Sequence, residues 1–166
     1  MKKSGRYRTA HLIEDQFEPG SKDRVLKNKV GITSTQEMHR HEKESQLHAM
    51  EKLVDLFDRN HRFTANDICK MHKIWLGGIY EWAGKYRQVK MSKNDFSFAF
   101  PEQIPKLMSE FEKGPLRELT PCLLNPARID LQSNALCDTG LIFSSNAFRC
   151  ILLIITTTTN HCLFCP

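Results

Sequence analysis

The chain changes composition abruptly near residue 120, which limits where a folded domain can lie. Of its 24 basic and 19 acidic residues, only Arg128, Asp130, Asp138 and Arg149 come after residue 120, whereas five of the six cysteines do. A single fold rarely changes its composition so sharply. We therefore expect a polar N-terminal arm at residues 1–27, one domain at residues 28–120, and an atypical, cysteine-rich and charge-poor tail at residues 121–166, produced by a frameshift or a truncation.

Two stretches of the expected domain carry apolar residues at the three- and four-residue steps of an amphipathic helix. The first helix is predicted from Thr33–Thr35 to Phe57, and its apolar stripe is Met38, Leu47, Met50, Leu53, Val54 and Phe57. The second is predicted to begin at Thr64, with Asp67 three residues later as in a capping box. Its apolar face comprises Ile68, Met71, Trp75 and Ile79.

A change of period follows the second helix. Apolar residues mostly alternate in Val89–Ser92 and in Phe96–Phe100, and Lys93-Asn94-Asp95 supplies turn chemistry between them. Pro101 then begins a third predicted helix, which Gly114-Pro115 ends. The expected fold class is mainly α with one short β-hairpin.

Charge and hydropathy narrow the partners and the compartment. The net charge is +5, but the basic residues are interleaved with acidic ones, whereas a nucleic-acid binder needs a continuous basic face, so a nucleic-acid partner is disfavoured. The basic N-terminus is not followed by the apolar core of an export signal, which predicts a cytoplasmic protein. The apolar run 141–155 is too short to cross a bilayer, so no membrane association is expected.

No residue pattern predicts a metal site or a catalytic group. His39, His41 and Glu42 suggest a zinc helix, but position 45, where a second ligand would have to lie, is Ser45. Cys162 and Cys165 offer two thiolates where a structural zinc site needs four ligands. Glycine-rich phosphate loops and a nucleophile elbow are also missing from the sequence.

The segment after the second helix is the most specific part of the sequence. Tyr80-Glu81-Trp82-Ala83-Gly84, with Arg87 downstream, is preceded by a helix and followed by a hairpin. In this order it resembles the Fic (Fido) domain family over roughly residues 25–112. The resemblance implies a Fic-type helical domain in which five residues shape the turn: Tyr80, Trp82, Ala83, Gly84 and Arg87.

The resemblance also implies a function. Fic proteins are known as AMP-transferases that use ATP and Mg²⁺ to modify a hydroxyl group on a target protein, and their hairpin, the flap, holds a target segment by strand addition. By resemblance this docking role falls on Val89, Lys90, Met91 and Ser92, with Phe96 and Phe98 as apolar walls. An ordinary hairpin that covers the core would show the same alternation, so both interpretations stay open.

The family's catalytic motif, H-P-F-x-x-G-N-G-R, is missing from the 166 residues. No catalytic residue can therefore be carried over, and we expect a chain that does not bind ATP and Mg²⁺ productively and is inactive. The alternative is a non-catalytic helical module that binds an extended peptide at its hairpin. Thr33 and Glu37 match part of the family's inhibitory motif but Met38 breaks it, which leaves an antitoxin-like inhibitor as an open question.

Overall fold

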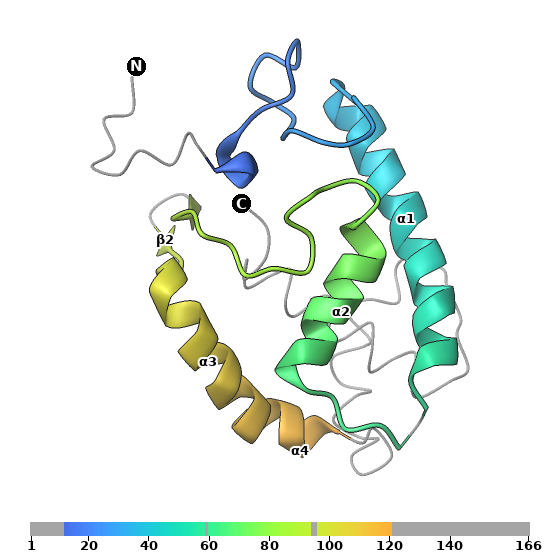
Figure 1. Cartoon of the computed structure of the whole chain (residues 1–166), viewed down its shortest axis with the longest axis vertical. Helices are drawn as coiled ribbons and strands as arrows, with labels where there is room; N and C mark the ends of the chain where they lie inside the picture. The colour runs from blue at the N-terminus through green and yellow to red at the C-terminus, as the bar shows by residue number, and fades with distance from the viewer. Residues whose placement is uncertain (1–11, 59, 94–95, 121–166) are drawn as a thin grey trace.

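A computed structural model of the chain describes residues 12–58, 60–93 and 96–120 (Figure 1). The elements are η1 (Ile13–Asp15), α1 (Thr35–Leu56), α2 (Ala65–Leu76), β1 (Ser92–Lys93), β2 (Phe96–Ser97), η2 (Pro101–Gln103), α3 (Ile104–Phe111), η3 (Glu112–Leu116) and α4 (Arg117–Leu119). The predicted mainly helical fold with one short hairpin is confirmed. The predicted tail at residues 121–166, with Cys162 and Cys165, lies outside the described residues.

Helices α1 and α2 run antiparallel and pack side by side (Figure 1). The start of α2 is fixed by the predicted capping box: Thr64 Oγ1 accepts from the Asp67 amide at 3.2 Å, and Asp67 Oδ2 accepts from the Thr64 amide at 3.0 Å. These two bonds satisfy amide groups that have no partner within the helix. The sequence pattern at Thr64 thus placed the helix start correctly.

The buried face of α1 differs from the predicted stripe at one position. Met38, Met50, Leu53 and Phe57 are buried as expected, and Ala49 joins them. Leu47, which the stripe included, is 39% exposed. Six residues separate Leu47 from Leu53, which turns the side chain about 120° around a helix of 3.6 residues per turn. The prediction for Leu47 was wrong because the core contacts a narrower face.

The third helical segment closes the core and extends further than predicted. Ile104 and Met108 of α3 pack with Leu53 and Met71 in one buried cluster. Gly114-Pro115 does not end the helical path, because the backbone passes through the π-helical turn η3 and continues into α4. A wider turn accommodates a proline, which has no amide hydrogen and whose ring crowds the preceding turn. The gain is the full burial of Leu116 in the same cluster.

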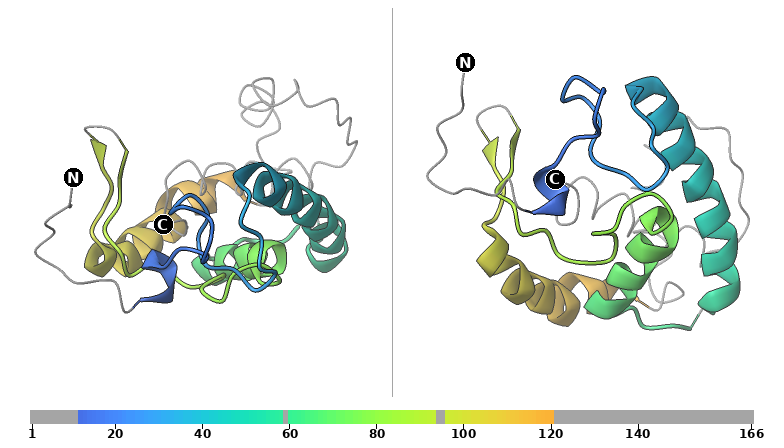
Figure 2. Two further views of the ribbon diagram at one scale, coloured as in Figure 1. Left: turned by 90° about the horizontal axis from the view of Figure 1, so that it is seen from above. Right: turned by 45° about the horizontal axis from the view of Figure 1, so that its top comes forward.

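Residues 12–27, the described part of the expected N-terminal arm, form a looped segment packed on the helices. The Glu18 amide donates to the Val25 carbonyl at 2.8 Å, and the Lys27 amide donates to the Gln16 carbonyl at 2.9 Å. Val25 is buried with residues of α1 and of the loop after α2. In Figure 2 this segment lies across the end of the helical layer from which the hairpin also emerges.

The hairpin projects from the helical body as a narrow two-stranded arm (Figure 2). Its register pairs Ser92 with Ser97 and Lys93 with Phe96. Within the described ranges, no helix combines the length and the apolar content needed to cross a bilayer.

Candidate functional site

The turn between α2 and the hairpin is built on an aromatic stack. The rings of Tyr80 and Trp82 are stacked with centroids 4.6 Å apart, and His72 of α2 stacks on Trp82 at 5.8 Å. All three side chains are buried. The Tyr80 hydroxyl donates to Glu42 Oε1 at 2.7 Å, which ties the stack to α1. The aromatic residues of the turn therefore hold it against both helices.

Gly84 occupies a position that a larger residue cannot take without strain. Its φ is +82°, in the left-handed region, and a Cβ there would lie 2.7 Å from Lys73 Cβ and 3.0 Å from the Cys69 carbonyl oxygen. Glycine lacks this atom and adopts positive φ readily. The backbone can thus lie directly on α2, as expected for the residue that the family pattern places here.

His72 is a structural residue of this turn that sequence reasoning did not single out. Its Nδ1 accepts a hydrogen bond from the Gly84 amide at 2.8 Å, and burial lowers the pKa of the imidazole to about 4. The side chain is therefore neutral near pH 7, with its proton on Nε2. A spacing of four from the buried Ile68 and Leu76 was the signal that could have placed His72 on the core face.

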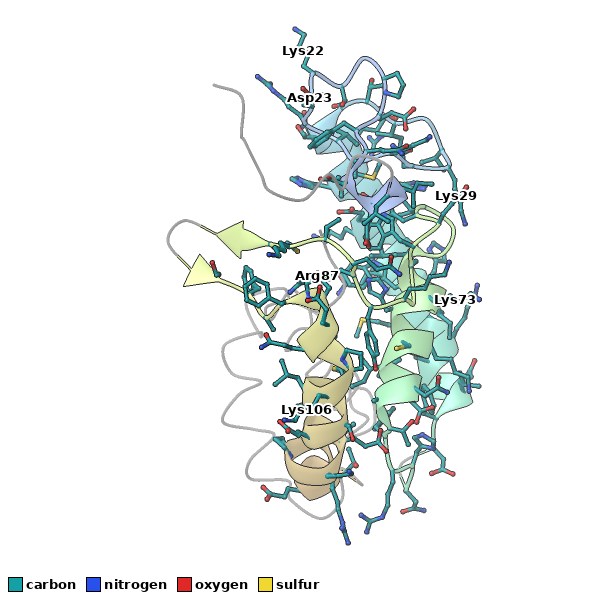
Figure 3. All side chains as sticks on the ribbon, turned by 60° about the vertical axis from the view of Figure 1, so that its left-hand side comes forward. Lys22, Asp23, Lys29, Lys73, Arg87 and Lys106 are labelled. Atoms are coloured by element: carbon teal, nitrogen blue, oxygen red, sulfur yellow. The ribbon has the colours of Figure 1, made fainter. Side chains whose placement is uncertain are left out.

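Arg87 joins the two legs of the hairpin. Only 1% of this residue is exposed. Its Nη1 donates to the Val89 carbonyl oxygen at 2.6 Å, before β1, and its Nη2 donates to the Ala99 carbonyl oxygen at 2.5 Å, after β2. Figure 3 shows Arg87 where the hairpin meets the helices. The planar guanidinium holds two divergent backbone segments at once, which a lysine ammonium cannot do with the same geometry.

Glu14 of η1 lies against the same point. It is buried, and its Oε1 accepts from the Gln88 amide at 2.5 Å. Burial raises the pKa of Glu14, while the hydrogen bond from Gln88 and the charge of Arg87 act in the opposite direction. The sequence pattern gave no sign of this role, because Glu14 lies within a polar stretch far from the hairpin along the chain.

The residues expected to dock a target lie on the hairpin in different environments. Val89 is buried, Met91 and Phe98 are half-buried, and Lys90 is exposed with its Nζ 4.5 Å from the centre of the Phe100 ring. For Ser92 and Phe96 the structure describes the backbone. Val89 therefore anchors the hairpin in the core and is not available to a partner.

Register determines which backbone groups of the hairpin point outward. The Phe98 amide donates to the Met91 carbonyl at 3.1 Å, so these two residues face each other across a hydrogen bond. Pairs alternate in an antiparallel ladder, so the amide and carbonyl of Ser92 and Ser97 point away from the partner strand. Ser92 thus presents donor and acceptor groups on the outer edge of β1, and Ser97 on that of β2.

The described residues do not supply the parts that ATP and Mg²⁺ would need. Among them, no three His, Cys, Asp or Glu side chains are grouped so that they could hold a metal ion. The sequence has no Gly-Asn-Gly loop whose amides could surround a phosphate. Cys69, the cysteine in the described part, is no nucleophile candidate either, because burial raises the pKa of its thiol despite a hydrogen bond with Tyr86.

Together these features define a helical domain with an aromatic turn and an arginine-anchored hairpin. Residues 62–123 match the model of the Fic/DOC family. The resemblance to Fic domains predicted from the sequence is thereby confirmed.

Two solved structures share this fold. One is the N-terminal Fic domain of a Bartonella effector protein from Bartonella sp. AR 15-3, with a TM-score of 0.55 and 18% identity over 91% of this chain and 74% of that chain. The other is BepC from Bartonella tribocorum with bound AMPPNP, with a TM-score of 0.52 and 17% identity over 87% of this chain and 76% of that chain. A search of curated protein sequences found no match.

Proposed function

We propose that this chain derives from a Fic-type protein adenylyltransferase, that its hairpin docks an extended segment of a target protein, and that the 166-residue polypeptide does not transfer AMP. The target segment would carry the hydroxyl side chain that enzymes of this type modify. The observation that carries the docking proposal is the anchoring of both hairpin legs by Arg87. A strand edge held rigidly at its base binds a peptide without first having to become ordered.

Strand addition suits the outward groups of the hairpin. Ser92 directs an amide and a carbonyl away from β2, and an extended peptide could pair with them whatever its own side chains. The apolar face beside this edge includes the half-buried Met91 and Phe98. Side chains of the docked segment could pack there, which would add preference for certain sequences to the backbone pairing.

Loss of AMP transfer follows from the chemistry that the sequence lacks. Transfer needs a base for the target hydroxyl and a cradle of amides and Mg²⁺ for the phosphates. His161 is the one histidine after the aromatic turn, and Cys162 follows it instead of the proline of the family motif. The AMPPNP bound to BepC supports nucleotide binding in related domains, but the residues that would do this are not recognisable in this chain.

A proline scan of the two strand edges tests the docking proposal. The full chain is used to select short random peptides displayed on phage, and binding is then measured for Ser92→Pro and Ser97→Pro. Each substitution removes an amide that points away from the partner strand, so the hairpin itself should persist. If the target pairs with β1, Ser92→Pro abolishes binding and Ser97→Pro leaves it within about twofold, a change of less than one hydrogen bond. Equal binding by both variants would contradict strand addition.

The selected sequences separate this proposal from the alternative, a binding module with no relation to AMP transfer. Descent from an adenylyltransferase predicts a Ser, Thr or Tyr at one fixed position of the enriched peptides. A β1-dependent peptide family without any hydroxyl residue would favour the alternative.

A further inference from the structure

We propose that Glu14 is a positioning residue for the hairpin, through which the N-terminal segment, residues 12–27, sets the orientation of the docking edge. Docking at this edge rests on the function proposed above. The positioning itself is a property of the free chain and can be measured without any target.

The first step in the argument is the contact made by Glu14. Its Oε1 accepts a hydrogen bond from the Gln88 amide at 2.5 Å, next to the residue that anchors the hairpin. Its negative charge acts on Arg87, and both side chains are buried. A buried guanidinium needs an opposite charge, since desolvation of an isolated ion is costly. Glu14 therefore holds one hairpin leg directly and stabilises the cation that holds both.

The second step is that Glu14 is itself held in place. The segment that carries it is closed by backbone hydrogen bonds between Glu18 and Val25 and between Gln16 and Lys27. Immediately after it, the Lys29 amide donates to the Ile79 carbonyl at 2.8 Å, and Lys29 Nζ donates to the Gly77 carbonyl at 2.8 Å. The segment is thus attached to the end of α2, so Glu14 transmits a fixed position to the hairpin.

A second carboxylate in the segment provides a matched control. Glu18 Oε2 accepts from the Asn28 amide at 3.0 Å. This bond closes the loop of the segment itself and does not involve Gln88 or Arg87. Glu18→Gln therefore perturbs the same segment by the same chemical change without touching the hairpin.

Hydrogen–deuterium exchange of the full chain tests the proposal. Glu14→Ala should speed exchange of the described hairpin amides, residues 88–93 and 96–99, by about tenfold relative to those of α1 and α2, because a charged hydrogen bond is lost. Glu14→Gln, which keeps an acceptor but no charge, should give a smaller increase, and Glu18→Gln should leave the hairpin at the wild-type rate. Glu14→Gln decides the question if Glu14→Ala fails to fold.

Two results would overturn the proposal. One is hairpin exchange in the Glu14 variants that stays at the wild-type rate. The other is an equal rise in the hairpin, α1 and α2, which would mean that Glu14 contributes only to overall stability. Because no peptide is present, failure of peptide docking would not affect either reading. If docking occurs, Glu14→Gln should also weaken peptide binding, while Glu18→Gln should not.

Discussion

Arg87 donates a hydrogen bond to the carbonyl oxygen of Ala99, a residue 12 positions later and on the opposite leg of the hairpin. The same guanidinium also bonds the carbonyl of Val89 on the near leg. The turn that ends in Arg87 and the hairpin that follows it are therefore one structural unit. A family-typical turn residue thus acts by fixing the base of the candidate docking arm.

Replacing Arg87 should loosen the hairpin and destabilise the fold. Arg87→Ala leaves Glu14 buried without its countercharge and two carbonyls without donors, so we expect a loss of about 3–5 kcal/mol in unfolding free energy. Arg87→Lys should cost less, about 1–3 kcal/mol, because a charge remains but not the two-pronged geometry. Urea unfolding measures both, with the exposed Arg117→Lys as control. A loss of less than about 1 kcal/mol for Arg87→Ala would contradict the anchoring role.

Three glycine substitutions separate backbone strain from crowding. Gly31→Ala carries a positive φ of 70° but has open space around the new Cβ, so it should cost about 1–2 kcal/mol. Gly84→Ala combines a positive φ with contact to Lys73 and should cost about 1–3 kcal/mol more. Gly114→Ala has open space and no positive φ and should be nearly neutral. Thermal unfolding of the three variants should follow this order, and equal losses at Gly84 and Gly31 would mean that α2 yields to the extra methyl group.

His72 should make the fold sensitive to mild acid. Burial depresses its pKa from 6.5 to about 4, so between these values the unfolded chain binds more protons than the folded one. Its contribution is complete above about pH 6.5 and is lost as pH falls toward 4, up to about 3 kcal/mol. Urea unfolding across this window should show the loss in the wild type and a flatter profile in His72→Phe. The exposed His48→Gln should retain the wild-type profile, and an unchanged slope in His72→Phe would disprove the assignment.

Two leucines on α1 test where the core lies. Leu53 is fully buried, whereas Leu56 is 52% exposed. Leu53→Ala should lower the unfolding free energy by about 2–5 kcal/mol, and Leu56→Ala by much less. Denaturant titration of both variants provides the comparison. Similar losses would indicate that another surface covers Leu56 in solution.

Local patterns predicted the local structure. The spacing of Thr64 and Asp67 is sufficient for a capping box, because all of its atoms lie within one helical turn. The alternation around residues 89–100 likewise indicated the hairpin, and the order of Tyr80, Trp82 and Gly84 indicated the turn.

Features that depend on distant segments could not be predicted in this way. Glu14 reaches Gln88 from a stretch that looks like solvated chain. Leu116 draws the backbone past Pro115, because the core it enters is formed by residues of α1 and α2. Local propensity at Gly114-Pro115 favours a helix end, but burial of a large apolar side chain outweighs it.

The measurement that addresses the central claim most directly asks whether a docked target is modified. A hydroxyl-containing peptide selected on the full chain is incubated with that chain, ATP and Mg²⁺, and its mass is then determined. We expect the peptide to bind in a β1-dependent manner and to keep its mass. A peptide that gains AMP in the presence of the chain, but not without it, would contradict the account.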